Sequence, residues 1–165
     1  MKNGLIVKAI IWGGNTQVDK KFSFKKVDEM SGRELFCVER LRSEVFVTEQ
    51  KITLPELDDT DLVATQVFLL NEKKTDALAT CRVFKDEKIG WMFGRVAVNK
   101  DTRGQHLGAK MMQEVHEFLC KKGVKQVACH AQMSARPFYE YLGYKTIGDV
   151  FDEGGIEHVM MVRDL

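Results

Sequence analysis

The sequence predicts an α/β (mixed α+β) fold, with a central mixed and mostly antiparallel sheet and helices on its faces. Runs rich in β-branched and aromatic residues alternate with runs in which apolar residues recur every three or four positions. After the N-terminal part, their order is helix, three strands, helix, strand, helix and two strands, which suits such a sheet. The 165 residues are expected to form a single domain, because no repeat, Pro-rich linker or break in composition divides them.

The N-terminal part is predicted to form two short strands and a capped helix. The strands are expected over residues 5–12 and 21–27, separated by a Gly and Asn turn cluster at 13–15. Ser31 and Glu34 have the spacing of a capping box, in which each side chain satisfies a backbone N–H group of the other residue. The apolar residues with helical spacing that follow are Leu35, Val38, Leu41 and Val45.

An acidic stretch and three β-rich runs follow this helix. The acidic residues after Pro55 are Glu56, Asp58, Asp59 and Asp61. A run of like charges is usually solvated, so an exposed loop is expected, with attraction of a cationic amine as the alternative. Residues 65–70, 77–84 and 89–98 are joined by polar turns and are predicted to form an antiparallel meander.

The C-terminal half is predicted to contain two helices and three strands. Residues 105–122 form the longer helix, which Gly123 ends. Its apolar stripe consists of Leu107, Met111, Val115 and Phe118. Ser134 is expected to cap the shorter helix, with Pro137 in its first turn and Gly143 at its end. The strands are predicted over residues 125–131, 146–151 and 156–162.

Composition and charge exclude several classes of function. The chain has 25 Lys and Arg against 24 Asp and Glu, so no overall positive field is available to hold nucleic acid or an anionic membrane. The apolar run at residues 5–12 is too short to span a membrane and lacks the pattern of a signal peptide. The four cysteines include no C-x-x-C pair, so core thiols in a reducing cytoplasm are expected and no metal site is indicated. These cysteines are Cys37, Cys81, Cys120 and Cys129.

The most informative junction joins a strand to the long helix. Residues 96–99 end the strand, and a Gly-containing turn from Arg103 to Gly108 enters the helix. Such a turn presents free backbone N–H groups at the positive end of the helix dipole, which favours a bound pyrophosphate. Gly104 and Gly108 allow the backbone to approach a ligand, and Arg103 can contact phosphate oxygens with two N–H groups. A plain strand-to-helix turn is the alternative; the spacing matches neither a Walker loop nor a dinucleotide fingerprint.

These residues resemble the GNAT superfamily of N-acyltransferases. Residues 103–109 are similar to its acetyl-CoA pyrophosphate loop, and residues 137–144 are similar to its later helix, which ends here in Leu-Gly-Tyr. The matches to the ElaA-like branch of the superfamily are residues 41–50, 94–96, 131–132 and 152–158. The resemblance runs in order from about residue 22 to residue 162 and leaves residues 1–20 outside it, as an extra strand and turn.

The resemblance implies a GNAT-like fold in which two neighbouring strands splay apart and bind acetyl-CoA between them, with no metal. The implied cofactor-binding residues are Val96, Ala97, Val98, Arg103, Gly104, Gln105, His106, Leu107, Gly108, Ala109, Gln132 and Phe138. Backbone groups of residues 96–98 are implied to pair with the pantetheine arm and to polarise the thioester carbonyl. The fourth loop position, usually Gly, is His106 here. Histidine tolerates a positive φ and its ring can donate to phosphate, so CoA binding is expected to survive, and its affinity is what this change affects.

The implied reaction is transfer of an acetyl group to a primary amine of a small molecule or peptide by direct attack. Tyr139 occupies the position of the acid that protonates the leaving thiolate, and a phenol with a pKa of about 10 suits a thiol with a pKa of about 8.5. Glu49 is the predicted general base, and His130 is the other candidate. The structural alternatives are ring packing for Tyr139, hydrogen bonds to loop backbone for Glu49 and Gln50, and an ordinary packed or surface position for His130.

Several functional questions stay open at this level. Gln132 matches the position that hydrogen-bonds the pantetheine amide, whereas Glu153 and His158 are expected to tie the closing hairpin. An acyl-CoA-binding sensor or interaction module with little turnover is the alternative function.

The expected partners are acetyl-CoA and an amine acceptor, whose identity the sequence does not specify. The extra N-terminal strand either covers a sheet edge or pairs with a second subunit in a homodimer, and the sequence leaves both open.

Overall fold

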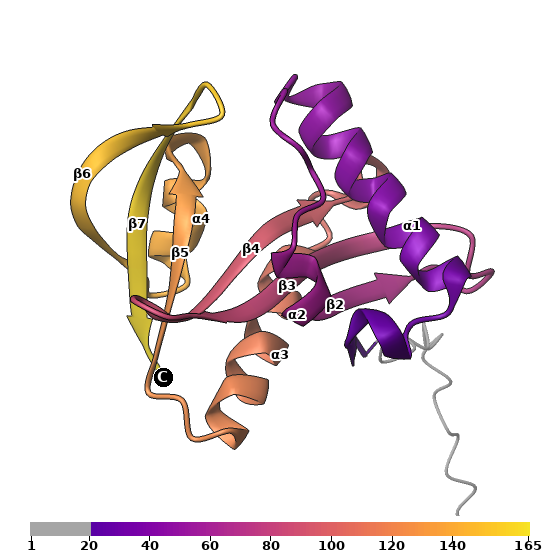
Figure 1. The fold of residues 1–165 in the computed structure, drawn as a ribbon, viewed down its shortest axis with the longest axis horizontal. Coiled ribbons are helices and arrows are strands. Elements are labelled where there is room, and N and C mark those ends of the chain that lie inside the picture. Colours follow the sequence, from indigo (N-terminus) through magenta and orange to yellow (C-terminus); the bar gives the residue numbers. More distant parts are fainter. Residues whose placement is uncertain (1–20) are drawn as a thin grey trace, which may run out of the picture.

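The computed structural model describes residues 21–165, which fold around a seven-stranded sheet (Figure 1). The strands are β1 (Ser23–Lys25), β2 (Thr65–Leu70), β3 (Ala77–Asp86), β4 (Gly90–Val98), β5 (Gln126–Gln132), β6 (Lys145–Glu153) and β7 (Ile156–Asp164). The helices are α1 (Gly32–Arg42), α2 (Thr60–Val63), α3 (Leu107–Lys121) and α4 (Arg136–Tyr141). The shorter helical segments are η1 (Val27–Glu29), η2 (Ser43–Glu49), η3 (Lys100–Thr102) and η4 (Met133–Ala135). The strand predicted over residues 5–12 and the turn after it lie outside the described residues.

The sheet is antiparallel except at one place. Its strand order is β1-β2-β3-β4-β5-β7-β6, and every neighbouring pair is antiparallel apart from β4 and β5. Within residues 21–165 these two parallel strands are in register at a single pair, Met92 and Ala128, beyond which they diverge (Figure 1). The predicted mixed sheet with a splayed strand pair is therefore confirmed, and so is the meander of β2, β3 and β4.

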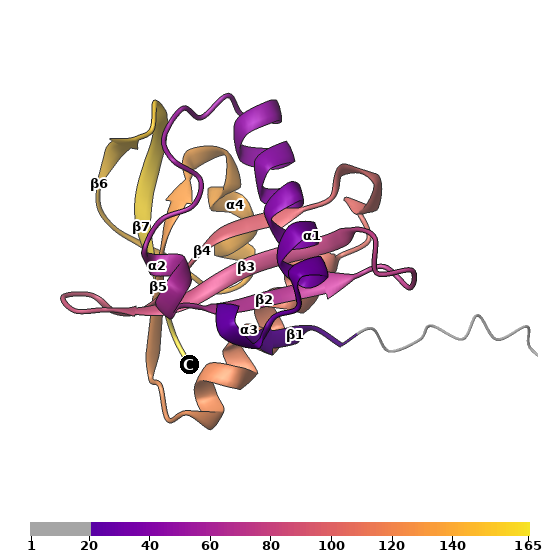
Figure 2. The same cartoon turned by 45° about the vertical axis from the view of Figure 1, so that its right-hand side comes forward.

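Helices cover both faces of this sheet, as predicted. Helix α1 lies across β2, β3 and β4 on one face, and α3 lies across the same strands on the other (Figure 2). The core on the α1 face is small: Cys37, Leu41, Val45, Phe46, Ala77 and Ala97. The core on the α3 face is larger, and α3 contributes Met111, Met112, Val115 and Leu119 to it. Successive side chains of a strand point to opposite faces, so Ala97 joins the first core while Val96 and Val98 pack against the second.

Helix α1 begins as the sequence predicts and ends in a wider turn. Ser31 Oγ accepts a hydrogen bond from Glu34 N at 3.2 Å, and Glu34 Oε2 accepts one from Ser31 N at 2.8 Å. After residue 42 the helix continues as the π-helical segment η2, in which Val45 and Phe46 stay buried. A π-helical turn inside a helix is uncommon and frequently marks a functional site. Here it carries Glu49 at its last residue.

Strand β4 contains a bulge just beyond its contact with β5. Thr80 and Arg82 of β3 lie opposite Ala97 and Gly94, so three residue steps in β4 face two steps in β3. Within this interval Arg95 has a φ of +53°, a left-handed conformation that is uncommon for a residue with a Cβ. Because a bulge bends its strand and increases the local twist, it turns the end of β4 away from its neighbour.

The second half confirms the predicted elements, with one correction. Helix α3 is followed by Gly123, whose φ is +75°, as expected for a residue that ends a helix. Pro137 lies in the first turn of α4. The prediction that Ser134 caps this helix is wrong, because Ser134 lies within the preceding turn η4 and the cap position is held by Ala135 without a side-chain hydrogen bond. The extra 3₁₀ turn moves the helix start past the serine.

The acidic stretch after Pro55 is partly buried, which corrects the expectation of an exposed loop. Asp61 is 7% exposed, and its carboxylate oxygens lie 2.8 Å from Arg42 Nη1 and 2.9 Å from Arg82 Nη1. Burial alone would raise the pKa of Asp61, but its hydrogen bonds and the two guanidinium charges outweigh burial and hold the pKa well below its usual range. Three of these carboxylates, those of Glu56, Asp58 and Asp61, therefore pair with arginines that are distant in the sequence.

Three of the four cysteines are buried. Cys37, Cys81 and Cys129 are buried free thiols, as expected, whereas Cys120 is exposed on α3, against the expectation of a core position. Burial raises the pKa of the Cys129 thiol to about 12, so this group is uncharged at neutral pH.

In the part of the chain that the structure describes, no helix is both long and apolar enough to cross a membrane.

Candidate active site

The site predicted from the sequence lies where β4 and β5 separate. The end of β4 pairs with β3 along one edge, since Ala97 lies opposite Thr80 and Val98 opposite Ala79, and Val96 lies in the bulge before them. Their other edge faces the gap, because β5 is in register with β4 only at Ala128 among the described residues. Unpaired backbone groups at such an edge are donors and acceptors that an extended ligand can use.

The turn after β4 has the backbone conformation expected for an anion cradle. Gly104 has a φ of +81°, and His106, at the N-cap of α3, has a φ of +58°. Histidine was expected to tolerate a positive φ at this position, and His106 adopts one. Its side chain accepts no hydrogen bond from the first turn of the helix, so within residues 21–165 the N-cap residue leaves the leading N–H groups of α3 without a side-chain acceptor. The exposed start of this helix is thus open to an anion.

Gly108 brings three of the predicted cofactor-binding residues together. A Cβ placed on Gly108 would lie 3.5 Å from Phe138 Cζ and 3.6 Å from Val98 Cγ2. The glycine therefore allows the first turn of α3 to pack closely against the end of β4 and the start of α4. Leu107 and Phe138 border the same larger core as partly buried side chains. Gln105 is exposed in the turn, and Ala109 is half-buried in the first turn of α3.

Arg103 and Glu49, predicted for different roles, contact each other. Arg103 Nη2 lies 2.9 Å from Glu49 Oε2 and 3.1 Å from Glu49 Oε1, and Arg103 Nε donates to the carbonyl of Val98 at 3.1 Å. Both side chains are substantially exposed. The contact joins the end of η2 to the turn after β4, and it occupies the carboxylate that was predicted to act as a base.

Gln132, at the end of β5, is joined to the residue next to Glu49. Gln132 Nε2 donates to Gln50 Oε1 at 2.7 Å. Further along the same segment, Ile52 and Leu54 fill the space that a Cβ on Gly154 would occupy in the turn between β6 and β7. Residues 49–54 therefore extend across the open end of the gap, from the turn after β4 to the β6–β7 hairpin.

Tyr139 is buried in an aromatic cluster on the α3 face. Its ring centroid lies 5.1 Å from that of Phe138 and 5.7 Å from those of Phe93 and Tyr144. Burial raises the pKa of Tyr139 well above its usual range, so the phenol keeps its proton throughout the neutral range. The ring packing expected as the alternative role is therefore real, and it also supplies the rigid setting that a catalytic phenol needs.

His130, the second candidate base, lies on the face of β5 opposite to Cys129 and Ala131, which belong to the larger core. Its Nδ1 is 3.5 Å from Glu153 Oε1, and its ring stacks edge-on against Phe151 at 4.9 Å. His158, which is buried, faces the other oxygen of Glu153 at 3.7 Å and its Nδ1 lies 2.8 Å from the carbonyl of Ile156. These contacts tie β5, β6 and β7 together, as expected for Glu153 and His158.

Two residues at this site have contacts that were not predicted: Gln50 was expected to hydrogen-bond loop backbone, and Arg95 carried no individual prediction. Gln50 contacts Gln132, and Arg95 forms the bulge that turns β4 away from β5. Both lie inside segments that resemble the ElaA-like branch, which is the signal that could have drawn attention to them. Their contacts are with residues that are far away in the sequence, so local patterns give no hint of them.

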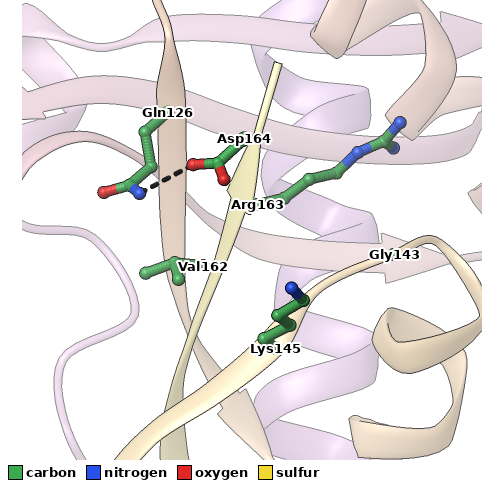
Figure 3. Close-up of a pocket in the computed structure, with 6 residues that line it drawn as sticks. All are labelled: Gln126, Gly143, Lys145, Val162, Arg163 and Asp164. Carbon is green, nitrogen blue, oxygen red and sulfur yellow. Dashed lines mark hydrogen bonds between the residues drawn. The ribbon is translucent and has the colours of Figure 1, made fainter.

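A separate pocket lies at the opposite end of the β5 and β7 strands (Figure 3). It has a volume of about 260 Å³, and its lining residues are Gln126, Gly143, Lys145, Val162, Arg163 and Asp164. Gln126 Nε2 donates to Asp164 Oδ1 at 2.9 Å across its floor (Figure 3). None of the residues predicted for the cofactor lines it. Within residues 21–165 no group of three or more His, Cys, Asp or Glu side chains is placed to hold a metal ion.

Comparison with known proteins agrees with the geometry. Residues 60–165 match the family model of the acetyltransferase (GNAT) domain. The chain is 31% identical to a UPF0039 protein of Schizosaccharomyces pombe over 147 residues, which cover 88% of this chain and 97% of that protein. It is 30% identical to protein ElaA of Escherichia coli over 140 residues, or 83% and 92% of the two chains.

Solved structures give the same assignment. An acyl-CoA N-acyltransferase from Pseudomonas aeruginosa superimposes with a TM-score of 0.78 and 28% identity, covering 87% of this chain and 98% of that one. The crystal structure of Escherichia coli ElaA superimposes over the same shares with a TM-score of 0.77 and 26% identity. The splayed strands, the open start of α3 and these matches together identify the chain as a member of the GNAT acetyltransferase family, whose chemistry is acyl-CoA-dependent acyl transfer.

Proposed function

We propose that this protein is an N-acetyltransferase that moves the acetyl group of acetyl-CoA to a primary amine. The observation that carries the proposal is the gap between β4 and β5 beside the uncapped start of α3. An extended thioester lying in that gap would meet the free edge of residues 96–98, and its pyrophosphate would meet the N–H groups of the turn and of α3. The acceptor would be a small molecule or a peptide.

In the proposed complex, the loop and the strand edge hold the cosubstrate. Gly104, Gln105, His106, Leu107, Gly108 and Ala109 would contact the pyrophosphate through backbone groups, with Arg103 contributing its remaining N–H donors. Val96, Ala97 and Val98 would pair with the pantetheine arm, and a fixed backbone N–H would stabilise the charge that develops on the thioester oxygen. Gln132 and Phe138 would flank the arm on the β5 and α4 side.

Tyr139 is proposed as the acid that protonates the leaving CoA thiolate. Among residues 21–165 the Tyr139 side chain has ring neighbours, and no group of the described residues accepts the proton of its hydroxyl. Its raised pKa keeps the proton in place, although it also makes transfer to a solvated thiolate uphill. The transfer becomes favourable only when the thiolate is desolvated to a similar degree, as it would be inside the gap.

Glu49 is proposed as the base that removes a proton from the attacking amine. Its contact with Arg103 supports a second role, in which Glu49 holds the guanidinium toward the phosphates. The two roles make different predictions for Glu49→Gln: loss of a base lowers kcat, whereas loss of the contact mainly weakens CoA binding. His130→Gln tests the other candidate in the same way.

The first experiment is thermal denaturation with acetyl-CoA, CoA, ATP and NAD in parallel. A ligand at 100 times its Kd adds about 2.7 kcal/mol to stability, which shifts the Tm by several degrees. Stabilisation by the two CoA species alone is expected, and stabilisation by ATP or NAD to the same extent would contradict the proposal. Thiol release is then measured with acetyl-CoA and longer acyl-CoA thioesters against a panel of primary amines.

Tyr139→Phe separates an enzyme from a binding module. The variant removes one oxygen and keeps the ring packing, so turnover should fall by about 100-fold or more while CoA affinity is retained. Tyr141→Phe is the matched control, because Tyr141 lies on the same helix with its side chain largely exposed. A wild-type protein that binds CoA but releases no thiol with any amine would favour the sensor or interaction module.

A further inference from the structure

The bulge in β4 is held by a side chain as well as by its backbone. Arg95, the bulged residue, directs its guanidinium toward the acidic stretch that follows Pro55. Its Nε lies 3.2 Å from both the carbonyl oxygen and Oε1 of Glu56, and its Nη2 lies 3.4 Å from Asp58 Oδ2. The strand position at which β4 leaves β5 is therefore bonded to a loop outside the sheet.

The loop residues that receive Arg95 are themselves fixed by two buried arginines. Arg42, at the end of α1, donates from Nε to Glu56 Oε1 at 2.7 Å and from Nη2 to the Glu56 carbonyl at 2.9 Å. Arg82 of β3 contacts both oxygens of Asp58, at 2.7 and 2.9 Å. Such two-pronged charged contacts are short and directional. The loop is thus anchored to α1 and β3, and Arg95 extends the anchor to β4.

The conformation of Arg95 argues that its side chain matters. A position with a φ of +53° is one that glycine adopts without strain, and arginine has no such tolerance. If the bulge needed only this backbone conformation, glycine would supply it more easily. The strain is accepted where surrounding contacts compensate for it, and the contacts with Glu56 and Asp58 are such a compensation.

We propose that Arg95 is a positioning residue whose contacts with Glu56 and Asp58, here called the bulge clamp, set the separation of β4 from β5. By fixing the bend, the bulge clamp would aim the backbone groups of residues 96–98 at the acyl-CoA arm. The inference rests on the proposed function for its consequence, since the positioned groups are those assigned to the cosubstrate. The bulge clamp itself is testable in the unliganded protein.

The test compares Arg95→Gly with Lys74→Gly. Lys74 also has a positive φ, +52°, but it lies in the turn between β2 and β3 and has no place in the proposed site. Both variants relieve the same kind of backbone strain, and only Arg95→Gly removes the bulge clamp. Hydrogen exchange of the segment 93–99 is measured without ligand, the Kd of CoA by calorimetry, and overall folding by circular dichroism.

We expect Arg95→Gly to remain folded, to exchange the amides of residues 93–99 about tenfold faster or more, and to bind CoA about tenfold more weakly. Lys74→Gly should change neither quantity. Arg95→Lys, which keeps a charge but loses the planar fork, should fall between wild type and Arg95→Gly in both. It also serves as the variant to measure if Arg95→Gly does not fold.

Two results would overturn the inference: unchanged exchange in residues 93–99, or faster exchange with unchanged CoA affinity. A wild-type protein that binds no CoA would contradict the proposed function instead. The bulge clamp would then be judged by the exchange of residues 93–99 alone, with faster exchange in Arg95→Gly supporting it and unchanged exchange refuting it.

Discussion

On the α3 face of the sheet, buried apolar side chains hold the helix, whereas on the α1 face the small apolar core is extended by a network of charges. The network comprises Glu39, Arg42, Glu56, Asp58, Asp61, Arg82 and Arg95. Apolar packing is non-directional and tolerates small shifts, but charged hydrogen bonds fix distances and angles. The directional contacts therefore lie on the α1 face, where Arg95 joins the bulge of β4 to the acidic stretch.

The charge network and its surroundings are not fully hydrogen-bonded. Arg82 Nε and Gln66 Oε1 are buried without a hydrogen-bond partner among the described residues, so its geometry is imperfect. Burial raises the pKa of Glu39 to about 7, which shows how strongly this face disfavours a carboxylate that is less fully paired. A buried network of this kind is expected to contribute geometry more than net stability, and to be costly to break.

The largest expected effect is that of Arg42→Ala. Arg42 is 1% exposed and contacts Glu39, Glu56 and Asp61, so its removal takes the counter-charge from Glu39 and leaves Asp61 with Arg82 alone and Glu56 with Arg95 alone among the described residues. A loss of about 4 kcal/mol in the free energy of unfolding is expected from urea denaturation. Arg136→Ala, which breaks an exposed pair with Glu140 on α4, should lose less than about 0.5 kcal/mol. Equal losses in the two variants would show that the charged face is held by its apolar core instead.

The counterpart on the α3 face is Met111→Ala. Met111 is fully buried between α3 and the sheet, and truncation leaves a cavity as well as removing apolar contact. A loss of about 3 kcal/mol is expected. Leu62→Ala on α2, where the side chain is largely exposed, is the control and should be nearly neutral. A loss below about 1 kcal/mol for Met111→Ala would mean that the apolar face is loosely packed.

A titration on the α3 face gives a smaller effect. His116 Nε2 lies 2.6 Å from Tyr144 Oη, and Arg163 Nη1 lies 2.8 Å from His116 Nδ1. Burial, with the charge of Arg163, lowers the pKa of His116 to about 4. In the unfolded chain His116 binds a proton near pH 6.5, whereas in the folded protein it stays neutral until the pH approaches 4. The free energy of unfolding therefore falls as the pH drops from 6.5 toward 4.

Between pH 7.5 and pH 5 this linkage should lower the free energy of unfolding by about 2 kcal/mol, measured as the difference between wild type and His116→Gln. The comparison with His116→Gln is needed because Glu39, whose pKa is raised, binds a proton in the folded protein over the same range. Its protonation raises the free energy of unfolding as the pH falls, which opposes the effect of His116. Parallel pH profiles for the two proteins would contradict the assigned pKa of His116.

The same contrast explains what the sequence could predict. Helix α3 and the capping box at Ser31 follow from neighbours three or four residues apart, and both were predicted correctly. Burial of Asp61 depends on arginines from another helix and another strand, so local charge density gave the wrong answer. The bulge at Arg95 was not predicted, because arginine in a left-handed conformation has no compositional signature.

Only part of the candidate site could be predicted from the sequence. The turn from Arg103 to Gly108 and the positive φ of His106 could be inferred from residue types in sequence. The contacts of Glu49 with Arg103 and of Gln50 with Gln132 could not, because they join segments whose proximity depends on the whole sheet. Sequence patterns thus identify the groups at the site, and tertiary contacts decide how those groups are arranged.

The smallest expected effect compares the two helix starts, one on each face. Helix α1 begins with the reciprocal bonds of Ser31 and Glu34, whereas the start of α3 at His106 has no side-chain cap. Ser31→Ala should lower the free energy of unfolding by about 1 kcal/mol, because an orphan N–H of α1 loses its acceptor. The stabilisation that CoA gives should not change, since α1 is closed by its own residues and α3 is the helix left open for the anion. A reduced response to CoA in Ser31→Ala would show instead that the position of α1 controls the opposite face.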